Sequence, residues 1–315
     1  MLAALARDGL LSGHLRVLDL GAGVGGPALG LFDFLPEEAL VEYHAVEPSA
    51  AADVLEDLLD EAPRNVHATI HRETAEAFEP DGEYDLVLAC SVLSELDDAE
   101  SVVRKYLGSL ADDGTFLGLA PADKHTSTHL RAVERAVEDD PATVYGPTPR
   151  LWPGRRPTDR GWTFDEQPAV ETPTVQARLA DASQDPGEFR HTDVRYSYSL
   201  LRLDGRRQHN VELSGDRLLA LGDADDRVTD RADVVAAKLS RNLADGEANP
   251  LFKVSDGSED TDCYAVLVRP TSLNRDVEAA DYGDLVSVED ALVLWNDDEE
   301  AYNLVFDEET VVEWA

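Results

Sequence analysis

Residues 15–32 read Leu-Arg-Val-Leu-Asp-Leu-Gly-Ala-Gly-Val-Gly-Gly-Pro-Ala-Leu-Gly-Leu-Phe: a short apolar strand, a glycine-rich turn, and an apolar pattern with helical spacing. Asp19 lies near the end of the strand. Gly21, Gly23 and Gly25 let the backbone turn sharply and approach a ligand without an intervening Cβ. The first N–H groups of the following helix have no partner within the helix, so they can face that ligand. The stretch therefore predicts a cofactor-binding turn.

A second acidic residue narrows the class of cofactor. Glu47 ends the apolar run 43–46, about 20 residues after the glycines, where a nucleotide-binding βαβ unit places a carboxylate on the ribose hydroxyls. This spacing fits a dinucleotide as well as S-adenosylmethionine. The run Asp19–Gly25, however, resembles motif I of the class I methyltransferases, and this resemblance favours S-adenosylmethionine. The alternative is a glycine turn that only packs the strand on the helix.

Strand and helix patterns alternate through the first 120 residues. Helical spacing over 50–60 and 99–110 separates strand-like runs at 65–70, 84–90 and 115–120. This order predicts a doubly wound, Rossmann-like α/β domain with a parallel sheet, whose ligand crevice lies at the carboxyl ends of the strands. We expect the cofactor to be bound there by Asp19, Gly21, Ala22, Gly23, Gly25, Glu47, Pro48, Ser49, Cys90 and Ser91.

The remainder of the chain divides into an insertion, a last strand and a second domain. Residues 141–173 hold seven of the 16 prolines and are expected to form a long irregular insertion. Residues 194–203 alternate as a strand does, before the hairpin signal Asp204-Gly205. Short strand patterns separated by Asp/Gly turns then predict a small β-rich, barrel-like domain. We therefore expect a domain over 1–207 and a second over 208–315.

The composition indicates an intracellular protein of a salt-rich cytoplasm. The chain has 65 acidic and 27 basic residues, a formal net charge of −38, and a surface that would repel itself at low ionic strength. A protein that captures cations or basic partners is the alternative, but a concentrated acidic tail is missing. Two cysteines exclude a disulfide framework, and no signal peptide or membrane span is expected. The abrupt start suggests that a segment upstream is missing.

The insertion contains the strongest candidate for RNA contact. Arginines alternate there with tryptophans, a combination suited to phosphate contacts and base stacking. The alternative is that the tryptophans anchor the loop while the arginines pair with neighbouring carboxylates. The candidate RNA-binding residues are Arg150, Trp152, Arg155, Arg156 and Arg160.

Catalytic residues are harder to find, because methyl transfer needs alignment and, for some acceptors, a base. The stretch 89–96 lacks the Asp/Asn-Pro-Pro-aromatic signature of adenine and exocyclic-amine methyltransferases. The nucleophilic cysteine of cytosine C5 methyltransferases follows a proline. Cys90 does not, so we expect its thiol to be buried and inert. Glu95 is the candidate catalytic residue, with a helix-capping role as the alternative. His125 and His129 have no neighbouring acid or thiolate, and no metal site is expected.

Several segments together resemble the Rsm-type methyltransferase-like proteins of the mitochondrial and microbial small ribosomal subunit. The resembling segments are Asp19–Gly25, Ala45–Ser49, Tyr84–Leu96, Asp193–Tyr198, Leu201–Gly205 and Tyr282–Leu285. The resemblance implies S-adenosylmethionine binding and association with the small subunit during its assembly. Some members carry an iron–sulfur cluster on cysteines of the insertion. Residues 146–166 of this chain contain no cysteine, so no cluster is expected.

Three functions follow from these observations. The first is an S-adenosylmethionine-dependent methyltransferase acting on the RNA of the small ribosomal subunit, reached through the insertion and the β-rich domain. The second is a non-catalytic assembly factor that needs the cofactor only to fold. The third is a small-molecule methyltransferase. The net charge opposes binding to a polyanion, but in molar salt the screening length falls to about 3 Å, and local arginines and stacking could then decide.

Overall fold

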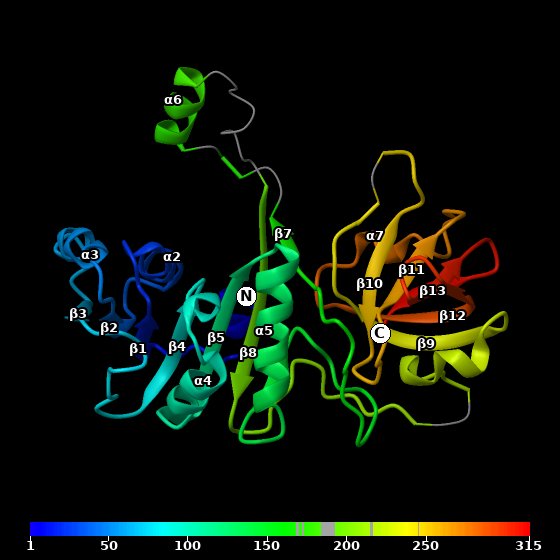
Figure 1. Ribbon diagram of the computed structural model, residues 1–315, viewed down its shortest axis with the longest axis horizontal. Helices are drawn as coiled ribbons and strands as arrows, with labels where there is room; N and C mark the ends of the chain where they lie inside the picture. Colours follow the sequence, from blue (N-terminus) through cyan, green and yellow to red (C-terminus); the bar gives the residue numbers. More distant parts are fainter. Residues whose placement is uncertain (168–169, 172, 184–192, 215–216, 245) are drawn as a thin grey trace.

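The N-terminal part of the protein is a mainly parallel sheet with helices on both faces (Figure 1). The computed structural model describes residues 1–167, 170–171, 173–183, 193–214, 217–244 and 246–315. The strands run in the spatial order β3-β2-β1-β4-β5-β8-β6. The first five in this order are parallel, and β8 runs antiparallel to both of its neighbours. Their bounds are β1 His14–Leu20, β2 Leu40–Val46, β3 Val66–His71, β4 Tyr84–Cys90, β5 Leu110–Pro121, β6 Thr143–Gly146 and β8 Val194–Arg202.

The helices cover the two faces of this sheet and create two cores. Side chains of α1, α2 and α3 pack on one face, with Leu5, Leu31 and Leu55 fully or almost fully buried. Side chains of α4 and α5 pack on the other face. In the described part of the chain, no helix has the length and apolar character needed to span a membrane. The bounds are α1 Leu2–Arg7, α2 Gly26–Phe34, α3 Ala51–Leu59, α4 Ala99–Leu107, α5 Lys124–Val137 and α6 Thr174–Ala182.

The Rossmann-like α/β fold expected from the sequence is confirmed, but the insertion is more regular than expected. Residues 141–173 contain β6 and a further strand, β7 (Asp165–Gln167). Strand β6 pairs with the carboxyl half of β8, and β7 pairs with Val194–Tyr196 at its beginning. Residues 147–164 between β6 and β7 have no helix or strand, as expected. The two short strands were not expected; they pair with backbone groups of β8, which would otherwise be an edge strand.

The C-terminal part forms a closed five-stranded barrel. Strand β9 pairs with β10, β10 with β11, β11 with β13, β13 with β12, and β12 with β9 again. Only the β11–β13 pair is parallel among these. The barrel-like domain predicted from the Asp/Gly-separated strands is thus confirmed. The bounds are β9 Arg231–Lys238, β10 Leu251–Ser255, β11 Cys263–Leu267, α7 Asp276–Ala279, β12 Leu285–Asn296, β13 Ala301–Phe306 and β14 Val311–Trp314.

The insertion connects the sheet to the barrel through buried contacts. The Leu151 N–H donates to the Asp256 carbonyl at 3.0 Å, and the Trp152 indole donates to the Asp256 carboxylate at 2.7 Å. The Lys253 ammonium donates to the Asp159 carboxylate at 2.6 Å, with both side chains almost fully buried. Figure 1 shows the chain after α5 passing beside the barrel before it returns to β8. These contacts fix the barrel beside the α5 side of the sheet.

Candidate functional site

A cavity of about 460 Å³ lies where the carboxyl ends of the parallel strands meet. Its volume is within the range typical of small-molecule sites. Most of the residues predicted to bind a cofactor line it, namely Gly21, Gly23, Glu47, Pro48, Ser49, Cys90 and Ser91, and so does the predicted catalytic Glu95. Loops that are up to 70 residues apart in sequence therefore meet at one site, as a doubly wound sheet requires.

The three glycines of the first turn have different roles. A Cβ on Gly21 would lie 2.7 Å from the Val92 side chain, so a larger residue would press on the loop after β4. A Cβ on Gly25 would lie 2.8 Å from the Leu55 side chain, so this glycine permits α2 to pack close to α3. Gly23 has a φ of +56° and nothing nearer than 4.0 Å. Its backbone therefore borders open space, as a turn that approaches a ligand should.

Glu47 is held rigidly at the edge of the cavity. One carboxylate oxygen accepts the Gly23 N–H and the other accepts the Ser49 N–H, each at 2.9 Å. Burial opposes ionisation, but the hydrogen bonds from Ser49 and Gly23 outweigh it and hold the pKa of Glu47 below its usual value. The carboxylate is therefore charged, and each oxygen keeps a lone pair for a further donor. This geometry fits the two adjacent hydroxyls of a ribose.

Asp19 lies behind the glycine turn and does not line the cavity. One of its oxygens accepts the Tyr43 hydroxyl at 2.6 Å, while the other is buried without a partner. Burial raises its pKa to about 7, the Tyr43 hydrogen bond lowers it, and the Glu47 charge raises it. Ala22 is also buried and tied back by its N–H to the Val46 carbonyl. With Gly25, these predicted cofactor residues support the turn rather than face the cavity.

The loop after β4 forms the opposite side of the cavity. Burial raises the pKa of the Cys90 thiol, as does the nearby Asp19. The thiol is therefore protonated, as expected for an inert cysteine. Ser91 has a φ of +62°, which is uncommon for a residue with a side chain and is characteristic of functional turns. Glu95 ends the short 3-10 helix Leu93–Glu95 and is exposed at the rim.

Six further residues line the cavity that the sequence reasoning did not select: Ala51, Thr74, Ala75, Glu76, Val92 and Leu96. The segment 74–76 follows β3, and the strand-like run at 65–70 was a signal that could have found it. In a parallel sheet every loop after a strand at this edge is a candidate. The segment is Thr74-Ala75-Glu76, with a hydroxyl at one end and a carboxylate at the other, and only its place after a strand indicates a role.

The cavity has the properties that S-adenosylmethionine requires. The cofactor carries a positively charged sulfonium and an ammonium group. Glu47, Glu76 and Glu95 line the cavity, and behind the glycine turn a buried Asp19 oxygen has no partner. Carboxylates favour the bound cation electrostatically. The open space beside Gly23 leaves room for the ligand where a Cβ would stand. The residues therefore fit this cofactor.

Metal ligands do not gather anywhere in the described ranges, where no group of three or more His, Cys, Asp or Glu side chains could hold an ion. His125 and His129 both lie on α5, four residues apart. Asp123, which precedes them, accepts the N–H groups of His125 and Thr126 and so caps the helix.

The arginines predicted to contact RNA are mostly paired within the chain. Arg150 contacts Glu138 at 2.6 Å, Arg155 contacts Asp223 at 2.7 Å, and Arg160 contacts Glu300 at 3.0 Å. Trp152 donates to Asp256, and Arg156 is exposed. These contacts match the alternative in which the tryptophans anchor the insertion and the arginines pair with carboxylates. A role of these residues in RNA binding stays a prediction.

Two family models each match a part of the chain. Residues 18–116 match the family model described as "Methyltransferase domain", and residues 222–315 match "Domain of unknown function (DUF8157) C-terminal domain". No curated protein matches the chain.

Solved structures with a similar fold include an S-adenosylmethionine-dependent methyltransferase from Clostridium acetobutylicum, with 15% identity and a TM-score of 0.32 over 38% of this chain and 47% of that one. The YcgJ protein from Bacillus subtilis has 16% identity and a TM-score of 0.39, with coverage of 66% and 99%. Coclaurine N-methyltransferase, solved with N-methylheliamine and S-adenosylhomocysteine, has 13% identity and a TM-score of 0.41, with coverage of 64% and 71%. This chain thus spans about half the length of the first of these proteins.

Proposed function

We propose that this chain, whose N-terminal part is a class I S-adenosylmethionine-dependent methyltransferase domain, methylates RNA of the small ribosomal subunit during its assembly. The observation that carries the methyltransferase assignment is the Glu47 carboxylate, fixed by the Gly23 and Ser49 N–H groups at the edge of the cavity. A fixed, charged acceptor beside a glycine turn binds the cofactor's sugar in one orientation.

Different residues of the cavity would bind the cofactor and assist methyl transfer. When bound, the cofactor supplies a methyl group on a positively charged sulfur. Glu47 would bind the ribose hydroxyls, and the Gly23 backbone would allow close approach. Glu95 is exposed at the rim, so its carboxylate can accept a proton from an acceptor group that arrives there.

The RNA substrate is supported by the position of the more discriminating resembling segments. Within Val92–Leu96, three side chains line the cofactor cavity. The Tyr-Ser-Tyr segment lies on β8, where the Tyr198 ring contacts the Tyr282 ring, with 5.7 Å between the ring centroids. Of these two segments, only Val92–Leu96 lines the cofactor cavity, where a substrate preference would be expressed.

Cofactor binding is tested by calorimetry with S-adenosylmethionine in concentrated potassium chloride. Replacing Glu47 with Ala should weaken binding by about tenfold or more, because a charged hydrogen-bond acceptor is lost. Glu73, which is exposed and does not line the cavity, provides the control Glu73→Ala with unchanged affinity. Equal affinities of the wild type and Glu47→Ala would contradict the ribose assignment.

The acceptor is tested with methyl-labelled cofactor and immature small subunits. Label in the RNA supports the proposal, and loss of label in Glu47→Ala shows that this site transfers it. Cofactor binding and co-sedimentation with the subunit without label would instead indicate a non-catalytic assembly factor.

A second candidate function, a small-molecule methyltransferase, is favoured by a neighbouring apolar cavity of about 290 Å³. Met1, Pro27, Leu88 and Leu119 are among the residues that line it, and Cys90 borders both cavities. A small apolar acceptor held there would lie beside the cofactor. Failure to co-sediment with the subunit in high salt, with methyl transfer to a small apolar nucleophile, would favour this function.

We also propose that the protein works in a salt-rich cytoplasm. Its formal net charge of −38 is tolerable where salt shortens the range of repulsion between carboxylates. The same screening would permit contact with RNA despite the overall negative charge.

A further inference from the structure

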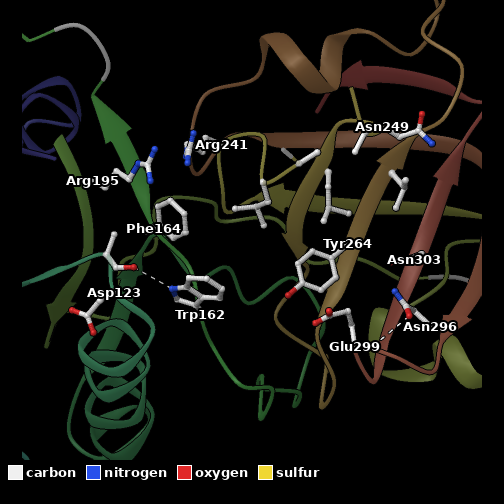
Figure 2. Close-up of a pocket in the computed structure, with 16 residues that line it drawn as sticks. Asp123, Trp162, Phe164, Arg195, Arg241, Asn249, Tyr264, Asn296, Glu299 and Asn303 are labelled. Atoms are coloured by element: carbon white, nitrogen blue, oxygen red, sulfur yellow. Dashed lines mark hydrogen bonds between the residues drawn. The ribbon is translucent and has the colours of Figure 1, made fainter. Parts of the chain in front are cut away.

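A second cleft lies between the sheet and the barrel, away from the cofactor cavity. Its volume is about 830 Å³. Trp162 and Phe164 of the insertion and Arg195 of β8 line it from the sheet side (Figure 2). Arg241 and Tyr264 line it from the barrel side. The cofactor assignment does not use this cleft.

The cleft covers a particular face of the barrel. Counted in chain order, the five barrel strands are connected in the circular order one-two-three-five-four, with strands three and five parallel. This is the arrangement of the oligonucleotide- and oligosaccharide-binding fold, in which ligands lie on strands two and three and on the loops between strands one and two and between four and five. Here those parts are β10, β11, the loop 239–250 and the loop 297–300. All four contribute to the cleft, through Leu251, Tyr264, Arg241 and Glu299.

Two half-buried aromatic rings border the open part of the cleft. Trp162 is held by its indole N–H, which donates to the Ala122 carbonyl at 3.2 Å, and by Phe164 behind it. Tyr264 projects from β11 on the other side, and Figure 2 shows both rings at the cleft. Rings fixed in this way are suitable platforms for bases, since base stacking contributes about 1–3 kcal/mol per base.

Two arginines lie together at one end of the cleft, as Figure 2 shows. Arg195 from β8 and Arg241 from the loop 239–250 both contact the single Glu166 carboxylate, at 2.5 and 2.7 Å. One carboxylate cannot neutralise two guanidinium groups, so this trio is positively charged. The acidic Asp123 and Glu299 balance the arginines over the whole lining. The four charged lining residues therefore have a formal charge of zero, or −1 when Glu166 behind the arginines is counted, on a chain with a net charge of −38.

The cleft begins next to the cofactor cavity in the sheet. Strands β4 and β5 are neighbours, and Cys90 stands beside Leu119 in their register. The Ser91 N–H, at the cofactor cavity, donates to the Leu119 carbonyl at 2.7 Å. Ala122 and Asp123, which directly follow β5, line the cleft. A chain bound in the cleft could therefore continue to the rim at Glu95.

We propose that this cleft binds a short single-stranded segment of RNA, with bases on Trp162 and Tyr264 and phosphates at Arg195 and Arg241. The amide groups of Asn249 and Asn303 also line the cleft and can hydrogen-bond to base edges. The inference rests on the proposed function for the choice of RNA over other polymers. Stacking is the main contribution, because the lining is neutral and molar salt weakens phosphate contacts.

The test is fluorescence anisotropy with a labelled oligouridine RNA of about eight nucleotides, in about 1 M potassium chloride and without cofactor. Wild-type protein should bind it, and Trp162→Ala or Tyr264→Ala should weaken binding about 5- to 100-fold. Trp314→Ala is the matched control, because Trp314 is exposed on β14 and outside the cleft, and its affinity should equal that of the wild type. Equal binding by the wild type and both cleft variants would overturn the inference.

A second variant keeps the test valid if an aromatic variant fails to fold. Arg241→Gln should leave the fold intact, because Arg241 is more than a third exposed, and should reduce the salt dependence of RNA binding by about one phosphate contact. An unchanged salt dependence would remove the phosphate assignment. Binding of a malto-oligosaccharide or a peptide in place of RNA would overturn the inference.

The outcomes are separable from those of the proposed function. RNA binding in the cleft without label transfer to ribosomal RNA would refute the proposed methyl acceptor and support the RNA-binding role of the cleft. If the cleft variants transfer label as fast as the wild type and bind oligouridine equally well, the RNA-binding role of the cleft is refuted and ribosomal RNA remains the proposed methyl acceptor.

Discussion

At the scale of single residues, the site uses two carboxylates in opposite ways. Glu47 accepts two backbone N–H groups and keeps its pKa low, whereas Asp19 is buried and its pKa is raised to about 7. Environments that push the pKa values of neighbouring acids apart give them different roles. Glu47 remains a charged ligand group, and Asp19 changes its charge near neutral pH.

The raised pKa of Asp19 predicts a pH dependence of folding. Its ordinary pKa is 3.8, so between about pH 4 and 7 the folded protein keeps a proton that the unfolded chain releases. Raising the pH through this window therefore lowers the free energy of unfolding. The side chain of Asp19→Asn cannot ionise and still accepts the Tyr43 hydroxyl. Between pH 5 and pH 8 the free energy of unfolding of this variant should therefore fall by less than that of the wild type, with a difference of more than about 1 kcal/mol. Urea unfolding at both pH values measures the difference.

The exposed Asp60 provides the control for this experiment. Asp60→Asn should follow the wild-type pH dependence. If Asp19→Asn also follows it, Asp19 is already ionised in the folded protein and the predicted linkage is absent.

The sequence predicted the residues that line the cavity better than the contacts of the buried residues behind them. Gly23 and Glu47 could be found because a turn without Cβ atoms and an acid at nucleotide-binding spacing are visible in the sequence. The partner of Asp19 could not, because Tyr43 is brought to it by a neighbouring strand. The arginines of the insertion were ambiguous for the same reason: their carboxylate partners Asp223 and Glu300 lie far along the chain.

At the scale of elements, the insertion determines how the two domains meet. Gly257 follows β10 with a φ of +78°, and a Cβ there would lie 2.0 Å from the Pro149 carbonyl oxygen. The insertion therefore passes directly against the backbone of the barrel. The sequence could not indicate this, because a proline-rich segment gives no sign of which surface it follows.

The close approach predicts a large effect of one methyl group. Gly257→Ala should lower the free energy of unfolding by about 2–4 kcal/mol, because it adds overpacking against backbone to left-handed strain. Gly154, also at positive φ but with nothing within 4 Å, supplies the control. Gly154→Ala should cost about 1 kcal/mol. Thermal unfolding of both variants measures the gap, and equal losses would mean that the insertion can move away from Gly257.

Strands with a long apolar pattern could be predicted from the sequence. Short strands that form only by pairing with a strand later in the chain could not. Strands β1, β2 and β4 have seven residues each and are rich in apolar residues; all three were predicted, β2 only over its last four residues, 43–46. Strands β6 and β7 have four and three residues and depend on β8, which comes later in the chain. Helix α5 has an apolar stripe and an Asp123 cap, but no helix was predicted over Lys124–Val137.

At the scale of the whole molecule, the dominant property is charge. With a formal net charge of −38, carboxylates repel one another across the surface. Salt reduces the screening length from about 10 Å at 0.1 M to about 3 Å at 1 M. The buried Asp159 at the barrel interface is paired with Lys253, whereas acids such as Glu37, Glu38 and Asp60 are exposed on the exterior.

This distribution predicts that salt stabilises the protein. Raising potassium chloride from about 0.1 M to about 2 M should raise the melting temperature by about 5 °C or more. The variant with Glu37→Gln, Glu38→Gln, Asp60→Asn and Glu61→Gln removes four exposed charges and should respond less. Calorimetric scans of both proteins measure the response. A melting temperature that falls with salt would show that ion pairs, which salt weakens, matter more than net repulsion.

The contacts between the insertion and the barrel also bear on how the chain matures as it is made. Asp159 meets Lys253, which is 94 positions later, and Trp152 meets Asp256, which is 104 positions later. A ribosome needs roughly 5–20 s to add about 100 residues. During that interval the insertion that follows the methyltransferase sheet has been synthesised, but its barrel partners Lys253 and Asp256 have not. The barrel is thus the part that completes the nascent protein, and a pause in translation before residue 253 would prolong its most vulnerable stage.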